Sequence, residues 1–384
     1  MRKPLIMILL LTLLMVFSFT GCNRNGDKPG EDEPIKIGLT DAFTGDRAGN
    51  GQYTKEGVDM FLEYINGKGG VLGREVVVVY EDDQGNETAA VNAYQKLILE
   101  NEDLTAVVLN KYSSVVLAME PYVADSKIPA ICSGSNVKIE QSTNPYLYST
   151  RRSDYGSGAT MAAFIKQEGA KRVAILYSPD ALGKGMSEIV IAKLQEAGIE
   201  VVSSQQFSEG EKQFANYVAK IKESNPDFIV CIGQTSETGL IVKAIYDAGL
   251  NHIKCIGNSA FAQATTIEQA GLEASEGWYS ITAFAAGTEE EPTASWIRSY
   301  TEKYGHAPEM TSVTTYDALS MICYAIEKAN STDPEAVNAE LKKILNFEGI
   351  AAVYSYNGNP MLANSEFVIQ IQNGKAIVLT KVIG

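Results

Sequence analysis

Residues 35–81 read IKIGLTDAFTGDRAGNGQYTKEGVDMFLEYINGKGGVLGREVVVVYE, and this stretch decides the fold. It begins with a short apolar run, residues 35–40, that predicts a β-strand. An amphipathic segment over residues 52–67 predicts a helix, and a second apolar run at residues 75–81 predicts another strand. Two strands joined by a helix are typical of a parallel sheet that helices cover on both faces.

The same alternation continues along the chain and starts a second series near residue 150. In the first series, further strands are predicted at residues 106–110 and 128–133, with helices at 87–101 and 113–126. After the apolar run 146–150, strands are predicted at residues 172–178, 199–204, 228–233, 253–257 and 277–283, with helices at 154–168, 184–197, 211–224, 237–248 and 263–271. The sequence therefore predicts two α/β units.

The pattern changes after Phe284. Helices are predicted at residues 293–304, 312–330 and 334–345, and strands at 350–356, 366–372 and 375–382. Between the last two strands lies Asn373-Gly374, a pair that accepts the positive φ angles of a type I′ hairpin turn. The closing segment is therefore expected to be antiparallel.

The N-terminal residues have the order of an export signal. Basic residues come first, an apolar run follows over residues 5–19, and Thr20-Gly21 precedes Cys22. We expect residues 1–21 to be a signal peptide and Cys22, in a sequence that resembles a bacterial lipobox, to carry a lipid anchor. An ordinary signal peptide with a chance cysteine is the alternative. Residues 22–33 contain no apolar side chain to bury after Cys22, so we expect them to form a flexible tether.

Composition narrows the function classes. Without residues 1–21 the chain has 30 basic and 47 acidic residues and a net charge of −17, which disfavours binding to nucleic acid. About 350 folded residues suggest two domains.

Catalytic and metal-binding signatures are scarce. The sequence has two histidines, no CxxC spacing, no GxSxG elbow and no phosphate-binding glycine loop. Cysteines 132, 231, 255 and 323 lie in apolar strand or helix patterns, as buried thiols do. We expect no enzyme activity, no cofactor and no metal.

Two polar loops follow predicted strands and could bind a ligand, because ligands bind at the carboxyl ends of parallel strands. In Asn110–Val115, Ser113 and Ser114 could offer hydroxyl and N–H groups to a carboxylate, although helix capping would also explain them. In Ser133–Asn136, the backbone of Gly134 allows close approach, and Ser135 and Asn136 offer donors and acceptors. A simple polar turn would explain the second loop as well.

The sequence resembles the leucine/isoleucine/valine-binding protein family of ABC importers, a branch of the type I periplasmic-binding fold. The resemblance covers nearly all of the expected mature chain and rests on GVDMFLEYINGKGGVLGREV at residues 57–76, Tyr80-Glu81-Asp82-Asp83, Ile128-Pro129-Ala130-Ile131 and Tyr316-Asp317-Ala318. It implies two doubly wound parallel-sheet lobes joined by a three-crossing hinge. The lobe boundaries are expected at 34–152 plus 284–363 for lobe 1, and 153–283 plus 364–384 for lobe 2.

The resemblance also implies a binding site between the lobes. The carboxylate-binding positions of the family fall on Ser113, the backbone of Gly134 and Asn136. Its ammonium-binding positions, an acidic residue and a tyrosine, fall on Ser259 and Gln234, and an aromatic contact falls on Leu182. Either another acid, such as Asp41 or Glu237, therefore meets the ligand's ammonium, or the ligand has none. Asn50 and Phe261 are further candidates for the pocket, and both could equally be loop and core residues.

The implied function is capture of a small molecule outside the cytoplasm. We expect a monomer, lipid-anchored at the membrane, that closes on an amino acid, of the branched-chain or another apolar type, and passes it to an ABC permease. An amide, a urea-like compound or an aromatic acid is the alternative ligand. A ligand-sensing receptor component is the alternative role.

Overall fold

The computed structural model describes residues 33–363 and 365–383, and residues 34–384 form one compact unit. The expected signal peptide, the lipidation site Cys22 and nearly all of the tether lie outside the described residues. Among the described residues, no helix is both long enough and apolar enough to span a bilayer.

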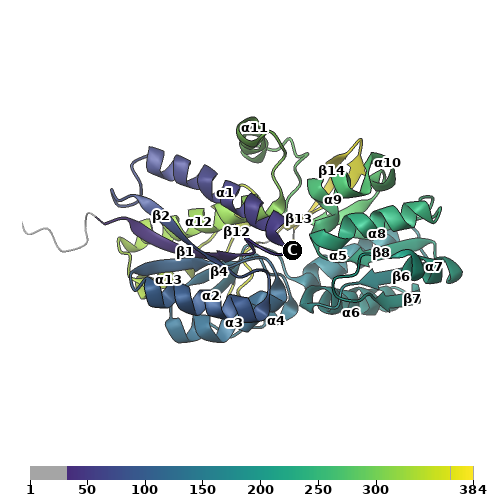
Figure 1. Cartoon of the computed structure of the whole chain (residues 1–384), viewed down its shortest axis with the longest axis horizontal. Coiled ribbons are helices and arrows are strands. Elements are labelled where there is room, and N and C mark those ends of the chain that lie inside the picture. Colours follow the sequence, from purple (N-terminus) through teal and green to yellow (C-terminus); the bar gives the residue numbers. More distant parts are fainter. Residues whose placement is uncertain (1–32, 364, 384) are drawn as a thin grey trace, which may run out of the picture. The chain divides into compact units, whose positions relative to one another are not determined.

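The first sheet has five strands, all parallel, in the order β2-β1-β3-β4-β5 (Figure 1). The strands are β1 Ile35–Asp41, β2 Val76–Asp82, β3 Leu104–Val108, β4 Ala130–Cys132 and β5 Leu147–Ser149. The chain starts in β1, adds β2 on one side and then returns to add β3 on the other. This reversal makes a crevice between the carboxyl ends of β1 and β3.

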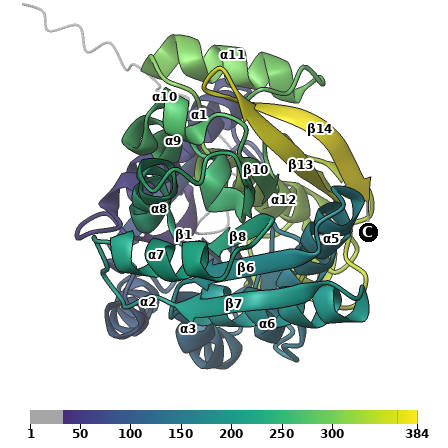
Figure 2. The ribbon, with the colours of Figure 1, turned by 90° about the vertical axis from the view of Figure 1, so that its right-hand side faces the viewer.

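The second sheet repeats this order with its own strands, β7-β6-β8-β9-β10, and extends it by an antiparallel hairpin, β13-β14 (Figure 2). The strands are β6 Arg172–Tyr177, β7 Glu200–Gln206, β8 Phe228–Ile232, β9 Lys254–Gly257, β10 Tyr279–Thr282, β13 Ser365–Gln372 and β14 Lys375–Ile383. Asn373 and Gly374 both have positive φ angles, 52° and 74°, as predicted for the hairpin turn. The equivalent crevice of this sheet lies between β6 and β8.

Helices cover both faces of each sheet. Around the first sheet they are α1 Ala48–Gly67, α2 Glu87–Glu100, α3 Ser113–Ser126, α4 Val137–Glu140, α11 Thr293–Tyr304, α12 Met310–Ala329 and α13 Pro334–Leu341. Around the second they are α5 Asp154–Gln167, α6 Ala181–Glu196, α7 Ala215–Glu223, α8 Thr235–Asp247, the 3-10 helix η1 Ser259–Ala262, α9 Ala264–Ala270 and α10 Leu272–Ser275. A two-stranded ribbon, β11 Phe347–Glu348 and β12 Val353–Tyr354, completes the elements.

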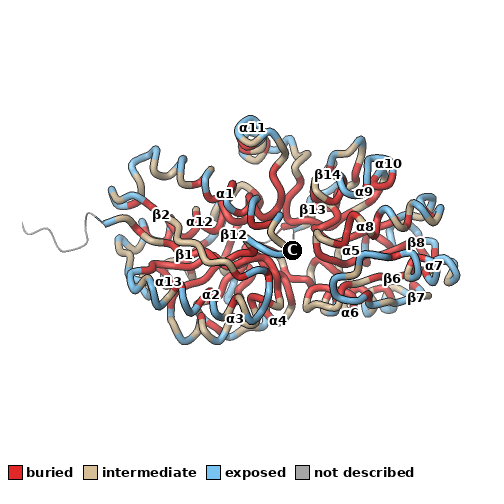
Figure 3. Tube along the Cα trace, viewed as in Figure 1, coloured by how far each residue is buried: buried red, intermediate tan, exposed pale blue. Residues whose placement is uncertain are grey.

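Alternation along each strand explains why both faces need cover. In β6, Val173 and Ile175 join a core with α5 and α6, whereas Ala174 and Leu176 join a core with α7 and α8. Successive side chains of a strand point to opposite faces, so an apolar strand buries both only between two helical layers. Buried residues accordingly follow the strands through the centre of each sheet (Figure 3).

The chain passes between the two sheets three times, after β5, after β10 and before β13, as expected for this fold. The first and third crossings lie side by side, because Ser149 N–H donates to Pro360 and Leu362 N–H donates to Ser149. They are also joined by a partly buried ion pair, in which Arg152 Nη1 lies 2.8 Å from Oε1 of the buried Glu366. Ser157 donates to the other oxygen of Glu366 at 2.6 Å.

Candidate functional site

The two crevices face one another across a cleft. From the first sheet come the segments that follow β3 and β4, and from the second come those that follow β6, β8 and β9. Each segment leads into a helix or a helical turn, so backbone N–H groups at the helix N-termini lie near the cleft. Two cavities, a deep one and an outer one, occupy it.

The deep pocket is small and polar. Its volume is about 20 Å³, which holds about one water-sized sphere. A solute of amino-acid size therefore enters only if the lobes separate or side chains move. The lining residues are Lys111, Ser113, Ser135, Arg151, Leu182, Gln234, Asn258, Ser259, Ala260, Gln263 and Met310.

Five of the residues singled out from the sequence meet in this pocket: Ser113, Ser135, Leu182, Gln234 and Ser259. They come from both lobes and from five different strand-to-helix connections. The structure therefore brings together residues that are up to 146 positions apart in the sequence. Their contact with a ligand stays a prediction.

Ser113 does not cap its helix. The residue before α3 is Tyr112, and no side chain caps this helix end. Instead, Ser113 Oγ accepts hydrogen bonds from the backbone N–H groups of Ser135 and Asn136, both at 3.3 Å. The hydroxyl therefore joins the two loops that sequence reasoning selected, at the N-terminus of a 14-residue helix.

Two other predicted site residues have structural partners. Asn136 Oδ1 caps α4 by accepting from Lys138 N–H, and Asn136 Nδ2 donates across the cleft to Ala181 O at 2.7 Å. Asn50 accepts from Lys111 Nζ at 2.6 Å and donates to the Tyr112 hydroxyl at 2.6 Å. Both residues hold the cleft walls rather than line either cavity.

Gly134 and Phe261 also lie behind the pocket walls. The carbonyl of Gly134 accepts from Ser149 Oγ, and a Cβ at position 134 would lie 2.6 Å from Ile139. Phe261 stacks on Trp278 with ring centroids 5.3 Å apart and belongs to the core of the second sheet. The sequence left open whether Phe261 is a pocket residue or a core residue, and the structure places it in the core.

Lys111 and Arg151 are the residues that sequence reasoning missed. Both are buried, with 8% and 6% of their surface exposed, and both line the deep pocket. Lys111 Nζ reaches across to Thr235 Oγ1 at 3.2 Å, and Arg151 Nη2 donates to Ser259 Oγ at 3.1 Å. Burial lowers the pKa of Lys111 to about 8 and lowers the pKa of Arg151 as well. The sequence signal that could have identified them was their position, because Lys111 lies two residues before Ser113 and Arg151 directly follows the apolar run 146–150.

Unpaired polar atoms gather at this pocket. Among the described residues, Ser135 Oγ and Gln263 Nε2 are fully buried without a hydrogen bond, and both residues line the pocket. The carboxyl oxygens of the nearby Asp154 are buried and make no hydrogen bond of ordinary geometry, although Ser135 lies close enough to lower its pKa. Burial dominates and raises the pKa of Asp154 to about 6. Buried polar groups are normally paired, so unpaired ones around one cavity indicate a place for ligand atoms.

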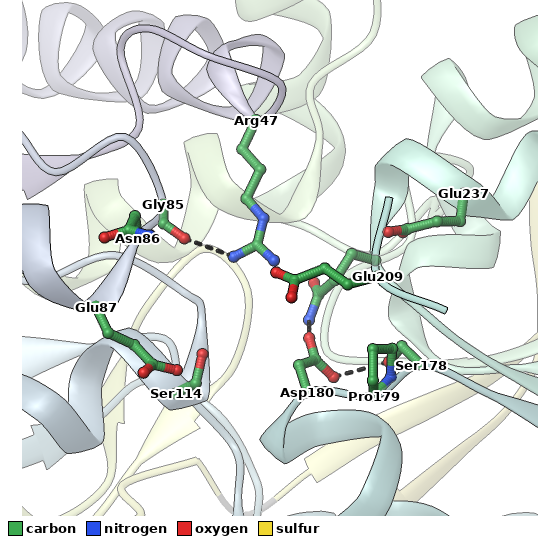
Figure 4. A pocket seen from close by; sticks show the side chains of 11 residues that line it. Arg47, Gly85, Asn86, Glu87, Ser114, Ser178, Pro179, Asp180, Glu209 and Glu237 are labelled. Atoms are coloured by element: carbon green, nitrogen blue, oxygen red, sulfur yellow. Dashed lines mark hydrogen bonds between the residues drawn. The ribbon is translucent and has the colours of Figure 1, made fainter. Parts of the chain in front are cut away.

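The outer cavity, of about 300 Å³, lies between residues of both lobes. Arg47 enters it from the start of α1 and donates to Gly85 O at 2.7 Å (Figure 4). The Arg47 guanidinium also lies over the Tyr112 ring, 4.3 Å from its centroid. Glu209 and Glu237 point into the cavity from the other lobe (Figure 4). Burial raises the pKa of Glu237. This arrangement suits an entrance to the deep pocket.

Four buried carboxyl groups predict a pH dependence of stability. Burial and the charge of Asp41 raise the pKa of Asp83 to about 7, and burial raises the pKa of Asp41. Burial likewise raises the pKa of Asp154 and of Asp317 to about 6. A raised carboxyl pKa means that the folded state binds more protons than the unfolded state between about pH 4 and pH 7, so stability falls as pH rises through this window.

We expect the free energy of unfolding to fall by on the order of 3 kcal/mol between pH 5 and pH 7.5. Urea denaturation at a series of pH values measures this. The Asp83→Asn variant, whose side chain does not titrate, should show a smaller fall. A free energy of unfolding that rises with pH over this range would contradict the assignment of the raised pKa values.

Comparisons with known proteins agree with this geometry. Residues 34–375 match the family model described as periplasmic binding protein. The Leu/Ile/Val-binding protein BraC3 of Rhizobium johnstonii is 27% identical over 319 residues, which are 80% of this chain and 83% of that protein.

Solved structures have the same fold. The leucine-binding protein LivK of Thermotoga maritima superimposes with a TM-score of 0.82 and 26% identity, over 91% of this chain and 99% of that one. An ABC transporter solute-binding protein of Rhodopseudomonas palustris, in complex with 3,4-dihydroxybenzoic acid, gives a TM-score of 0.84 at 20% identity, over 91% and 97%.

Proposed function

Because the chain belongs to the periplasmic binding protein family, we propose that it captures a small carboxylate solute outside the cytoplasm and delivers it to an ABC importer. The resemblance to the leucine/isoleucine/valine-binding proteins is confirmed at the level of the family. Members of this family are solute-binding proteins rather than enzymes. The observation that carries the proposal is the deep pocket, whose lining comes from both lobes.

The proposed mechanism is closure of two lobes about the three crossings. We keep the boundaries 34–152 plus 284–363 and 153–283 plus 364–384, which the membership of strands in the two sheets supports. Contacts across the cleft, such as Asn136 with Ala181 and Thr265 with Glu309, stabilise the closed state. A ligand that touches both lobes would shift the population toward closure by its differential affinity.

Both the relatives and the residues of the deep pocket favour a ligand that carries a carboxylate. Several relatives are named as binding proteins for leucine, isoleucine or valine, and an aromatic acid is bound in one structural neighbour. Both classes carry a carboxylate. Ser113, the N-terminus of α3 and the two buried cations support a carboxylate in this pocket.

A thermal-shift panel of amino acids and small organic acids tests the proposal. A ligand that prefers the native state must raise the melting temperature. At a ligand concentration of a hundred times Kd, it adds about 2.7 kcal/mol to the free energy of unfolding. We expect one binding site per chain. If no compound of either acid class shifts the melting temperature, capture of a carboxylate is refuted.

Replacement of Ser113 by Ala should weaken the binding of the identified ligand about tenfold, because one hydrogen-bonding hydroxyl is lost beside the proposed carboxylate site. Isothermal titration measures the affinity. The exposed Ser299→Ala on α11 is the control, for which we expect no change. Unchanged affinity in Ser113→Ala would remove this residue from the site.

We also propose that Cys22 carries a lipid that holds the mature chain at the membrane surface. The apolar run followed by Thr20-Gly21-Cys22 supports this. Cell fractionation should find the wild-type chain in the membrane fraction and Cys22→Ser largely in the soluble fraction or still unprocessed. Equal membrane association of processed wild type and variant would contradict lipid anchoring.

A further inference from the structure

The deep pocket has an unusual balance of charge for a site that accepts an amino acid. Its lining contains two cationic side chains, Lys111 and Arg151, and no carboxylate. A zwitterion needs an acceptor for its ammonium as well as donors for its carboxylate, because an unpaired buried charge is costly. The walls of this pocket supply donors for a carboxylate but no carboxylate that could accept from an ammonium.

Most hydrogen-bond donors of Arg151 have no partner among the described residues, although the buried carboxyl groups of Asp154 and Glu366 act on its charge. Its guanidinium has five N–H donors, and within the described part of the chain it uses one, to Ser259 Oγ. The side chain is 6% exposed, so bulk water does not satisfy the remaining donors. Since Arg151 lines the pocket, these donors are available to a bound acceptor.

Lys111 adds a second cation within reach of the same space. Its ammonium donates to Asn50 Oδ1 and Thr235 Oγ1, which leaves one of its three donors without a partner among the described residues. The acids that act on it electrostatically are Asp41 and Glu309. Asp41 accepts from Ala42 N–H and Thr54 within its own lobe, and Glu309 accepts from Thr265 across the cleft. Both acids compensate the charge of Lys111 from behind the pocket wall.

The remaining free groups are also mainly donors. Gln263 Oε1 accepts from Thr235 Oγ1, so its unpaired Nε2 is the group left over. Asn258 uses both ends of its amide on Gly233. Gln234 donates to Asp180 through Nε2, and its Oε1 has no partner among the described residues. The pocket thus offers several donors, and its neutral acceptors are Gln234 Oε1 and the hydroxyl oxygens of its serines.

We propose that this pocket selects a small carboxylate that lacks an ammonium group, such as a 2-hydroxy acid, a 2-oxo acid or a hydroxylated aromatic acid. The inference rests on the proposed function, because it assumes that the cleft captures a solute. Lys111 and Arg151 would pair with the carboxylate, Gln263 Nε2 would donate to a neighbouring oxygen, and Gln234 Oε1 would accept from a hydroxyl. An ammonium in the same place would lie against two like charges.

The positions that the family uses for the ligand's ammonium fit this interpretation. Ser259 receives a hydrogen bond from Arg151, and Thr235, next to Gln234, receives one from Lys111. The chain therefore places its own cations beside the two residues onto which the ammonium-binding positions fall. Asp154 is the buried acid that could contradict this, because its carboxyl group acts on Arg151 and Ser135, which both line the pocket, but Asp154 is not itself a lining residue.

Matched ligand pairs test the proposal. The mature chain, residues 22–384, is titrated calorimetrically with leucine, 4-methyl-2-oxopentanoate and 2-hydroxy-4-methylpentanoate, and then with phenylalanine, phenyllactate and 4-hydroxybenzoate. For each carbon skeleton, that of leucine and that of phenylalanine, we expect the acid without an ammonium to bind at least about tenfold more tightly than the amino acid. If the amino acid binds more tightly, the inference falls and the proposed function stands. If nothing in the panel binds, both fall.

Variants locate the effect. Lys111→Gln and Arg151→Gln should each weaken binding of the preferred acid by about tenfold or more, with Lys184→Gln, an exposed cation on α6, as the charge-matched control. If Arg151→Gln does not fold, Lys111→Gln decides alone. Asp154→Asn should keep the preference for the acid over the amino acid. Loss of amino-acid binding in Asp154→Asn, with acid binding absent in the wild type, would assign the ammonium to Asp154 and overturn the proposal.

Discussion

A tryptophan at position 185 is expected to lower the affinity for the ligand by about 100-fold or more while the chain stays folded. Gly185 lies on α6 of the second lobe, where the two lobes touch. A Cβ at this position would lie 2.6 Å from Nδ2 of Asn136, which belongs to the first lobe. The same Asn136 amide closes the cleft by donating to Ala181 O at 2.7 Å. A bulky side chain there would hold the lobes apart and remove the closed state that binds.

Two variants control this experiment. Lys184→Trp places the same bulk on the neighbouring, exposed position of α6 and should leave the affinity unchanged. Gly185→Ala should have a smaller effect than Gly185→Trp, because the atom it meets is the end of a flexible side chain. Isothermal titration measures all three. Wild-type affinity in Gly185→Trp would show that capture does not require this lobe contact.

Replacement of Glu366 by Ala should lower the free energy of unfolding by about 3 kcal/mol, because it leaves the partly buried charge of Arg152 without its partner. The side chain of Glu366 is 3% exposed, pairs with Arg152 at 2.8 Å and accepts from Ser157. Its charge also acts on the buried Arg151. The pair joins the first and third crossings, so its loss should destabilise the segments about which the lobes move.

An exposed ion pair of the same length provides the control. Arg172 and Glu200 also lie 2.8 Å apart, but Glu200 is 64% exposed, so Glu200→Ala should cost less than about 1 kcal/mol. The double variant Arg152→Met/Glu366→Leu should recover much of the loss, because it removes both charges together. Urea unfolding measures each variant. A loss in Glu366→Ala no larger than in Glu200→Ala would contradict a structural role for the partly buried pair.

Most of the fold could be predicted because its strands are buried on both faces. Such strands read as short apolar runs, and the helices between them are long enough to show their period. The predicted helix over residues 293–304 matches α11, and the turn at Asn373-Gly374 matches the hairpin. Helices α4, η1 and α10 were missed, since four residues are too few to show a period.

Helix α6 begins at Ala181 rather than at the predicted residue 184. Asp180 caps it by accepting from Gly183 N–H, and the glycines at 183 and 185 obscured the start of the helical pattern. The capping aspartate was the signal that could have placed this end. The same Asp180 then accepts from Gln234 at the mouth of the deep pocket, so the cap also orders the site.

Site residues that follow a strand within one sheet could be predicted from the sequence. Residues that belong to the site only because the two lobes meet could not. Ser113 and Ser135 follow strands of one sheet, so local pattern was enough to select them. Lys111 and Arg151 become pocket residues only because elements of the second lobe bury them. A lysine after a strand normally points to solvent, and no local pattern distinguishes this one.

A distance measurement across the cleft tests the central claim most directly. Glu87 and Glu209 are exposed and line the outer cavity from opposite lobes, so cysteines at both positions can carry spin labels on residues 34–384. The native thiols there, Cys132, Cys231, Cys255 and Cys323, are buried, which protects them from labelling. Addition of the ligand should shorten and narrow the distance distribution between the labels. An unchanged distribution at a concentration that saturates binding would show that the solute is held without lobe closure.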